Sequence, residues 1–194
     1  MKRCIYLLLL LSLYAFAEEP TVPTAERFYG TVMVSNAPRT GIMRITVTIE
    51  RWTTIEERKK LIDAIKAGGT DALVEAMDKL DAGYVQIDSN LRWPIRFAIS
   101  WQTAKGRLVR FATNRPINFL ESWNNTLTSD YPIGVIEVFL PLEGKGEGVL
   151  LAATKIRFNE QGRLEVQSLP TNTGPQKLSD VEVEKLKPEK SKKK

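Results

Sequence analysis

The stretch from Ile133 to Phe158 limits the fold more than any other part of the chain. Its first limb, I-G-V-I-E-V-F-L-P-L, is apolar on both faces of an alternating pattern, which is typical of a strand covered on both sides. By alternation, one face carries Ile136, Val138, Leu140 and Leu142, and the other carries Val135 and Phe139. The glycines of E-G-K-G-E-G allow the chain to reverse into a second strand, V-L-L-A-A-T-K-I-R-F. We therefore expect this strand pair to organise the fold.

A change from alternation to helical spacing predicts two helices in the first half of the chain. The sequence T-T-I-E-E contains a capping box, Thr54 with Glu57, or the same motif one residue earlier. Gly68-Gly69 is expected to end the first helix, because adjacent glycines favour a helix terminus. The pattern predicts a helical hairpin over about residues 55–81, with apolar stripes that must lie on a sheet.

The remaining alternating segments predict strands with short connections, which favour antiparallel neighbours. No regular alternation of strand and helix is present in the sequence. The prediction is an α+β fold, a mostly antiparallel β-sandwich or open barrel of about eight strands with one helical hairpin packed on it. Within the strand from Trp93 to Trp101, both tryptophans share one apolar face and are expected in the core.

The first 17 residues are typical of a secretory signal peptide. Lys2 and Arg3 precede an apolar run, and A-F-A fits the cleavage pattern. The apolar run is too short to span a bilayer, so we expect no transmembrane segment after processing and a secreted or periplasmic location. Cleavage before Glu18 would remove Cys4, the only cysteine, and would leave no disulfide.

Charged residues are unevenly distributed along the chain. Of 28 Lys and Arg residues, two lie in residues 1–17 and six from Lys185 onward, which leaves 20 against 22 Asp and Glu in the body. We predict a flexible lead over residues 18–26, a single β-rich domain over 27–184 and a Lys-rich disordered tail over 185–194. The tail is interpreted either as a solvated extension or as a contact with an anionic envelope surface.

Several short runs resemble a set of secreted bacterial proteins of unknown function. They are R-W-T-T-I-E-E-R, G-G-T-D-A-L-V-E-A, F-A-T-N-R-P-I, D-Y-P-I-G-V-I-E and G-K-G-E-G, spread over most of the mature chain. The resemblance is to an uncharacterised family, and it implies export without implying an activity, a ligand or a catalytic residue.

Several kinds of catalytic, metal and nucleotide site are excluded because the sequence lacks the residues or motifs that they need. The sequence contains no histidine, so histidine triads, histidine acid–base catalysis and histidine metal sites are excluded. It also lacks a G-x-S-x-G motif, a P-loop and a dinucleotide fingerprint, and G-K-G-E-G reads as a turn between strands. We therefore predict no cofactor, no metal and no catalytic residue, and we leave open whether the protein is an enzyme.

The candidate ligand-binding residues combine aromatic rings with amide and carboxylate groups in one polar loop, as in a sugar platform. They are Trp123, Asn124, Asn125, Asp130 and Tyr131. Glu121 and Asp130 flank this loop and form a candidate carboxylate pair for glycoside hydrolysis, with surface charge as the alternative interpretation. Glu137 lies inside an apolar strand and is expected to pair with one of three arginines on neighbouring strands, namely Arg96, Arg110 or Arg157.

Two functional hypotheses follow. The first is an exported, non-catalytic binding or interaction domain whose partner is an unknown protein, a glycan or an apolar ligand. The second is an Asp/Glu-dependent, glycoside-type hydrolase acting outside the cytoplasm. Export argues against nucleic acid as a partner. Two carboxylates that converge in one concave site would favour the hydrolase.

Overall fold

The computed structural model describes residues 25–36, 39–88, 91–117, 130–169 and 175–186. The predicted signal peptide and the predicted tail beyond Leu186 lie outside these ranges. The elements in chain order are β1 (Glu26–Asn36), β2 (Arg39–Ile49), α1 (Ile55–Asp78), β3 (Gly83–Ile87), β4 (Leu91–Thr103), β5 (Gly106–Thr113), β6 (Ile133–Pro141), β7 (Gly146–Phe158), β8 (Leu164–Ser168) and β9 (Gln176–Lys185).

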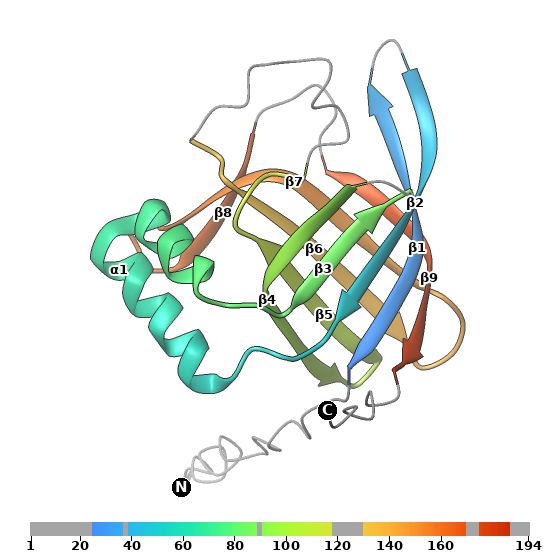
Figure 1. Cartoon of the computed structure of the whole chain (residues 1–194), viewed down its shortest axis with the longest axis horizontal. Coiled ribbons are helices and arrows are strands. Elements are labelled where there is room, and N and C mark those ends of the chain that lie inside the picture. Colours follow the sequence, from blue (N-terminus) through green and yellow to red (C-terminus); the bar gives the residue numbers. More distant parts are fainter. Residues whose placement is uncertain (1–24, 37–38, 89–90, 118–129, 170–174, 187–194) are drawn as a thin grey trace, which may run out of the picture.

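Eight of these strands form a closed antiparallel barrel (Figure 1). Strands β1 to β6 pair in chain order, β6 pairs with β7, and β9 lies between β7 and β1. The remaining strand, β8, pairs with the C-terminal part of β7 and lies outside the closed ring. The predicted mostly antiparallel β fold with helical cover is confirmed. The barrel is closed, however, so the open form was wrong, and the sandwich alternative is not supported.

Apolar side chains from every barrel strand fill the barrel. Phe28 and Phe111 meet edge to face at 5.0 Å between ring centroids, and Trp52 lies 6.5 Å from Phe111. Ile136 and Val138 of β6 belong to this interior cluster, as predicted for that face of the strand. Near its start, β6 is covered on both faces, since Ile136 lies in the interior cluster and Val135 lies in the cluster described next. Leu142, just after β6 ends, is 72% exposed.

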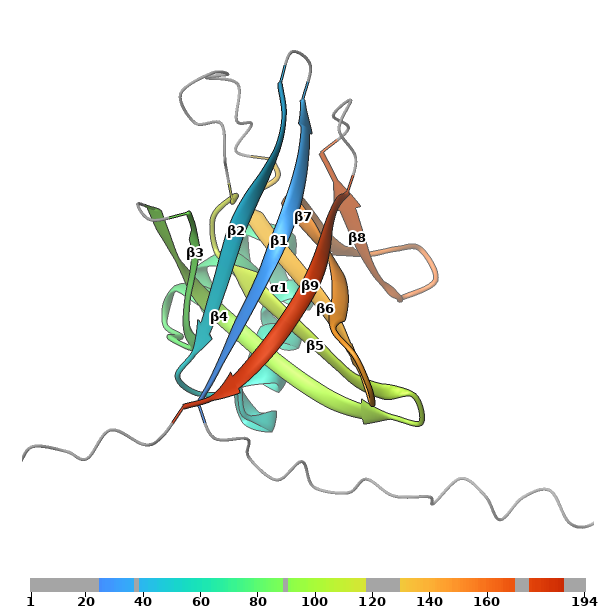
Figure 2. The same ribbon diagram turned by 90° about the vertical axis from the view of Figure 1, so that its right-hand side faces the viewer.

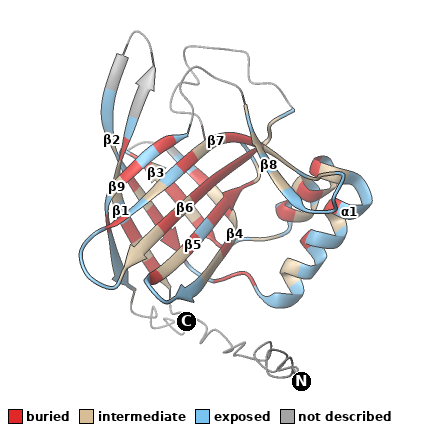
Figure 3. Cartoon of the chain, turned by 180° about the vertical axis from the view of Figure 1, so that it is seen from behind, coloured by how far each residue is buried: buried red, intermediate tan, exposed pale blue. Residues whose placement is uncertain are grey.

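A second apolar cluster lies outside the barrel, between α1 and the outer faces of β4 to β7. Leu61, Ile65, Leu73 and Met77 of the helix are buried there, together with Val135 on the outer face of β6. Figure 3 shows buried stretches within α1. Burial on this side explains why the strand from Ile133 is apolar on both faces.

The predicted helical hairpin is a single element with a break. Gly68 and Gly69 have non-helical backbone angles, and Gly69 adopts a φ of 67°, which favours glycine. The Thr70 hydroxyl donates to the carbonyl oxygen of Ile156 at 2.8 Å and ties the second half of the helix to β7. The helix ends at Asp78, a few residues before the predicted boundary.

A bulge in β4 corrects the prediction for Trp101. The β4–β5 register shifts between Ile95 and Phe97, so the residues on either side of the shift exchange faces. Trp93 points into the barrel and is 3% exposed, whereas Trp101 points outward and is 36% exposed. The guanidinium of Arg110 lies 5.4 Å from the Trp101 ring.

An ion pair closes the barrel end at which β1 begins. Arg107 donates to both carboxylate oxygens of Glu26, at 3.0 and 2.5 Å, and to Ser100 Oγ at 3.1 Å. Glu26 is 1% exposed, and the Arg107 guanidinium also lies 5.2 Å from the ring of Trp52. Glu26 was assigned to the flexible lead by the sequence, but it is the first residue of β1.

The capping box at the start of α1 is confirmed. Glu57 N–H donates to Thr54 Oγ1 at 3.2 Å, and Thr54 N–H donates to the Glu57 carboxylate at 2.9 Å. The Arg51 guanidinium also donates to that carboxylate, and together these bonds hold the pKa of Glu57 below its ordinary value of 4.5 although burial opposes them. The same contacts fix where the helix begins.

Thr54→Ala is expected to lower the free energy of unfolding by about 1 kcal/mol, because it removes one half of the capping box. Since the folded pKa of Glu57 is lowered, its contribution is present above pH 4.5 and is lost as the pH falls through the folded pKa. Urea denaturation of wild type and Thr54→Ala at neutral pH measures the first effect. Urea denaturation of wild type and Glu57→Gln at neutral pH and at acid pH measures the second. An equal loss on acidification in wild type and Glu57→Gln would contradict this assignment.

Candidate functional site

The outer surface of the barrel has a covered side and an uncovered side. α1 packs on β7 and β4, and in Figure 2 it lies behind the barrel while β1, β2 and β9 face the viewer. Among the described residues, no element packs on the outer face of β9, β1, β2 and β3. Hydrogen bonds between polar side chains cover part of this face, and in one of them the Tyr29 hydroxyl donates to the Glu184 carboxylate at 2.8 Å. Tyr29 also accepts from Arg27, which raises the pKa of Arg27 above its ordinary value.

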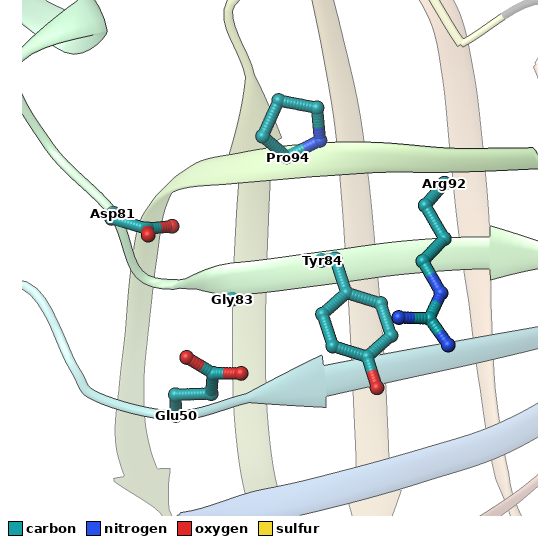
Figure 4. A pocket seen from close by; sticks show the side chains of 6 residues that line it. All are labelled: Glu50, Asp81, Gly83, Tyr84, Arg92 and Pro94. Atoms are coloured by element: carbon teal, nitrogen blue, oxygen red, sulfur yellow. The ribbon is translucent and has the colours of Figure 1, made fainter.

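A concavity of about 280 Å³ opens on this side where β3 begins. Its lining residues come from the position just after β2, from the start of β3 and the residues before it, and from β4 (Figure 4). They are Glu50, Asp81, Gly83, Tyr84, Arg92 and Pro94.

Strand pairing sets the floor of this concavity. Tyr84 lies opposite Thr48 of β2 and Pro94 of β4, and it points outward because its neighbour Val85 is fully buried in the barrel. Gly83 adopts a φ of 136°, and a Cβ there would lie 2.0 Å from the Thr48 carbonyl oxygen. Only glycine fits this position, and it brings the backbones of β2 and β3 close together.

The aromatic ring at the centre of the site is oriented by an arginine. The Arg92 guanidinium lies over one face of the Tyr84 ring, 4.5 Å from its centroid, and its Nε donates to Gln86 Oε1 at 3.3 Å. Neither terminal nitrogen of Arg92 has a side-chain or backbone acceptor among the described residues. Arg92 is exposed, so these donors are available at the rim of the site.

Two carboxylates lie at the other end of the site. Figure 4 shows the side chains of Glu50 and Asp81 at the same edge of the concavity, beside Gly83. Glu50 N–H donates to the Ala82 carbonyl, and Ala82 N–H donates to the Ile95 carbonyl, both at 2.9 Å, so Glu50 and the residue that follows Asp81 are held by the barrel backbone. Within the described part of the chain, neither carboxylate forms an ion pair. Together they supply acceptors and negative charge.

The site therefore offers acceptors at one end, an aromatic ring in the middle and donors at the other end. A sugar ring matches this order, because its hydroxyl groups both donate and accept and its C–H face packs on an aromatic ring. The site is open and shallow, so the geometry is suited to holding a ligand against the surface.

The predicted ligand-binding loop is only partly described. Trp123, Asn124 and Asn125 lie outside the described residues, as does Glu121 of the predicted carboxylate pair. Asp130 is exposed and Tyr131 is half-buried. Asp130 lines a second concavity, of about 450 Å³, with the helix break at Gly68-Gly69, Thr70, Asp71 and Lys155.

Glu137 has the partner that the sequence suggested. Arg110, on the adjacent strand β5, donates to its carboxylate through Nε at 2.9 Å and through Nη2. The pair lies on the outer surface, with Glu137 partly exposed, so the carboxylate is occupied in a structural contact. No group of three or more potential metal ligands occurs among the residues with described positions.

Sequence reasoning missed the residues around Tyr84. Glu50, Asp81 and Arg92 are far apart in the chain and belong to no motif, and strand pairing alone brings them together. A weak signal was present in Gly83 and Pro94, since both residue types are unusual in strands.

Comparisons with protein-family models, with curated proteins and with solved structures give no match to this chain. Within the ranges that the structure describes, no helix has the length and apolar character needed to cross a membrane.

Proposed function

We propose that the protein is an exported, non-catalytic binding domain that holds a glycan on the outer face of its barrel. The observation that carries this proposal is the position of the Tyr84 ring between the Glu50 and Asp81 carboxylates and the Arg92 guanidinium. Hydroxyl groups of a sugar would bond to the charged groups, and the sugar's C–H face would pack on the face of the ring that Arg92 does not cover.

Packing of the barrel supports a ligand outside it. Phe28, Phe111 and Trp93 occupy the interior, and the ion pair of Glu26 with Arg107 closes one end. An apolar ligand inside the barrel would have to displace these side chains, at a cost of several kcal/mol. The shallow site at β3 needs no such rearrangement.

Tyr84→Ala is expected to weaken glycan binding by about tenfold or more, because a central aromatic contact is worth at least about 1.4 kcal/mol. The measurement is isothermal titration of the full chain with a panel of chito- and cello-oligosaccharides. Tyr29→Ala is the matched control, since Tyr29 is an exposed tyrosine of the same outer face outside the concavity. Equal affinities of wild type and Tyr84→Ala would contradict the proposed site.

One observation favours the glycoside-type hydrolase as a second candidate. Glu50 and Asp81 line the same concavity, and two carboxylates at one site are what such a reaction uses. In this case wild type would release reducing ends from the same oligosaccharides, and Glu50→Gln and Asp81→Asn would each abolish release. Binding without any release by wild type would favour the binding domain.

A further inference from the structure

Strand β8 is the one described strand that lies outside the barrel. It pairs with β7 from Thr154 to Phe158, and no described residue pairs with its other edge (Figure 2). Proteins protect such an edge by keeping the strand short, or with charged residues such as lysine, with proline, with a bulge or with a covering element. The sequence of β8, L-E-V-Q-S, contains neither lysine nor proline.

The exposed face of β8 continues the apolar cluster beneath α1. Val166 lies opposite Ile156 and Leu164 lies opposite Phe158, so all four side chains share one face. Ile156 and Phe158 pack in that cluster, but Val166 is 46% exposed and Leu164 is 52% exposed. An apolar row formed by these four side chains therefore extends beyond the cover of the helix.

The register of β8 with β7 shows which backbone N–H and C=O groups of β8 point toward its free edge. Leu169 N–H donates to the Ala153 carbonyl at 2.9 Å, and antiparallel pairing alternates between bonded and non-bonded residues. The backbone groups of Glu165 and Gln167 are then directed to β7. Those of Leu164, Val166 and Ser168 are directed outward.

We propose that β8 pairs with β8 of a second copy of this chain, antiparallel and about a two-fold axis at Val166. Val166 then lies opposite Val166 of the other copy, and Leu164 lies opposite Ser168. All three residues with outward backbone groups are paired in this register. Two barrels would share one continuous sheet through β7 and β8.

Side-chain complementarity selects this arrangement. Antiparallel pairing about Val166 places Glu165 opposite Gln167. Within one chain the Gln167 amide donates to the Glu165 carboxylate at 3.4 Å, and across the axis it would make the same bond to Glu165 of the other copy. Parallel pairing in register would instead place Glu165 opposite Glu165, which is unfavourable. Arg157 Nε lies 3.7 Å from the Glu165 carboxylate and offsets part of its charge. A contact of two such short strands buries less than about 1,000 Å², so the dimer is weak and depends on concentration.

Sedimentation velocity of the full chain over a range of concentrations tests the proposal. Wild type should show a concentration-dependent monomer–dimer equilibrium, and Val166→Lys should remain monomeric because two lysines would meet at the axis. Val149→Lys is the matched control and should dimerise as wild type does, since Val149 is an exposed valine on a strand paired on both edges. A monomeric wild type at every concentration, or a dimer that survives Val166→Lys, would overturn the proposal.

Register is tested by cysteine cross-linking in a Cys4→Ser background. Glu165 and Gln167 of opposite copies form a non-bonded pair, in which the Cα atoms lie about 4.5 Å apart, within the range of a disulfide. A mixture of Glu165→Cys and Gln167→Cys chains should therefore form a disulfide-linked dimer on mild oxidation, more than either variant alone. Equal cross-linking in all three samples would overturn the proposed register. This test does not depend on whether the Val166→Lys variant folds.

Discussion

Arg107→Met lowers the free energy of unfolding by about 3–5 kcal/mol, because it leaves the Glu26 carboxylate buried and without its partner. Glu26 is 1% exposed and accepts two hydrogen bonds from Arg107. The loss is measured by urea denaturation at neutral pH.

The double variant Glu26→Met with Arg107→Met is the control. Replacing both members of a buried ion pair by apolar side chains is often neutral. We therefore expect the double variant to recover most of the lost stability. If the double variant lost the sum of the two single effects, the pair would not act as a unit and the account of the closed barrel end would be wrong.

Phe111→Ala is expected to cost about 3–5 kcal/mol, as for other buried aromatic truncations. Phe111 is fully buried, packs edge to face with Phe28 at 5.0 Å and also contacts Trp52. The measurement is again urea denaturation. Leu142→Ala is the control and should change stability by less than about 0.5 kcal/mol, because Leu142 is 72% exposed. Similar small losses in both variants would contradict the filled interior.

Alternation and helix signals predicted much of the fold because they act locally. The strand pair of β6 and β7 and the capping box of Thr54 with Glu57 depend on residues close in sequence. The break at Gly68-Gly69 was visible for the same reason. These features required no knowledge of which strands are neighbours.

Closure of the barrel could not be predicted because it depends on β9. That strand reads Q-K-L-S-D-V-E-V-E-K, with few apolar residues, and it pairs with β1 and β7 across long sequence separations. Trp101 was misplaced by a bulge, which exchanges faces without a clear sequence signal. Glu26 appeared to belong to a polar lead because its partner, Arg107, lies far along the chain.

The candidate site was missed for a related reason. Tyr84 and Arg92 lie on adjacent strands, whereas Glu50 and Asp81 flank the whole of α1 in sequence. Pairing of β2 with β3 brings the two carboxylates to one edge. The predicted cluster around Trp123 was chosen for residue type within one loop, and only Asp130 and Tyr131 of it lie in the described structure.

Amide and methyl NMR spectra, recorded while a chito-oligosaccharide is titrated into the full chain, test most directly whether the ligand binds outside a filled barrel. The amide signals of Glu50, Gly83 and Tyr84 are expected to shift. The methyl signals of Val109 and Ile136 are expected to stay unchanged, because those methyl groups lie in the interior on other strands. Shifts of the Val109 and Ile136 methyl signals without changes around Tyr84 would place the ligand inside the barrel and contradict the account.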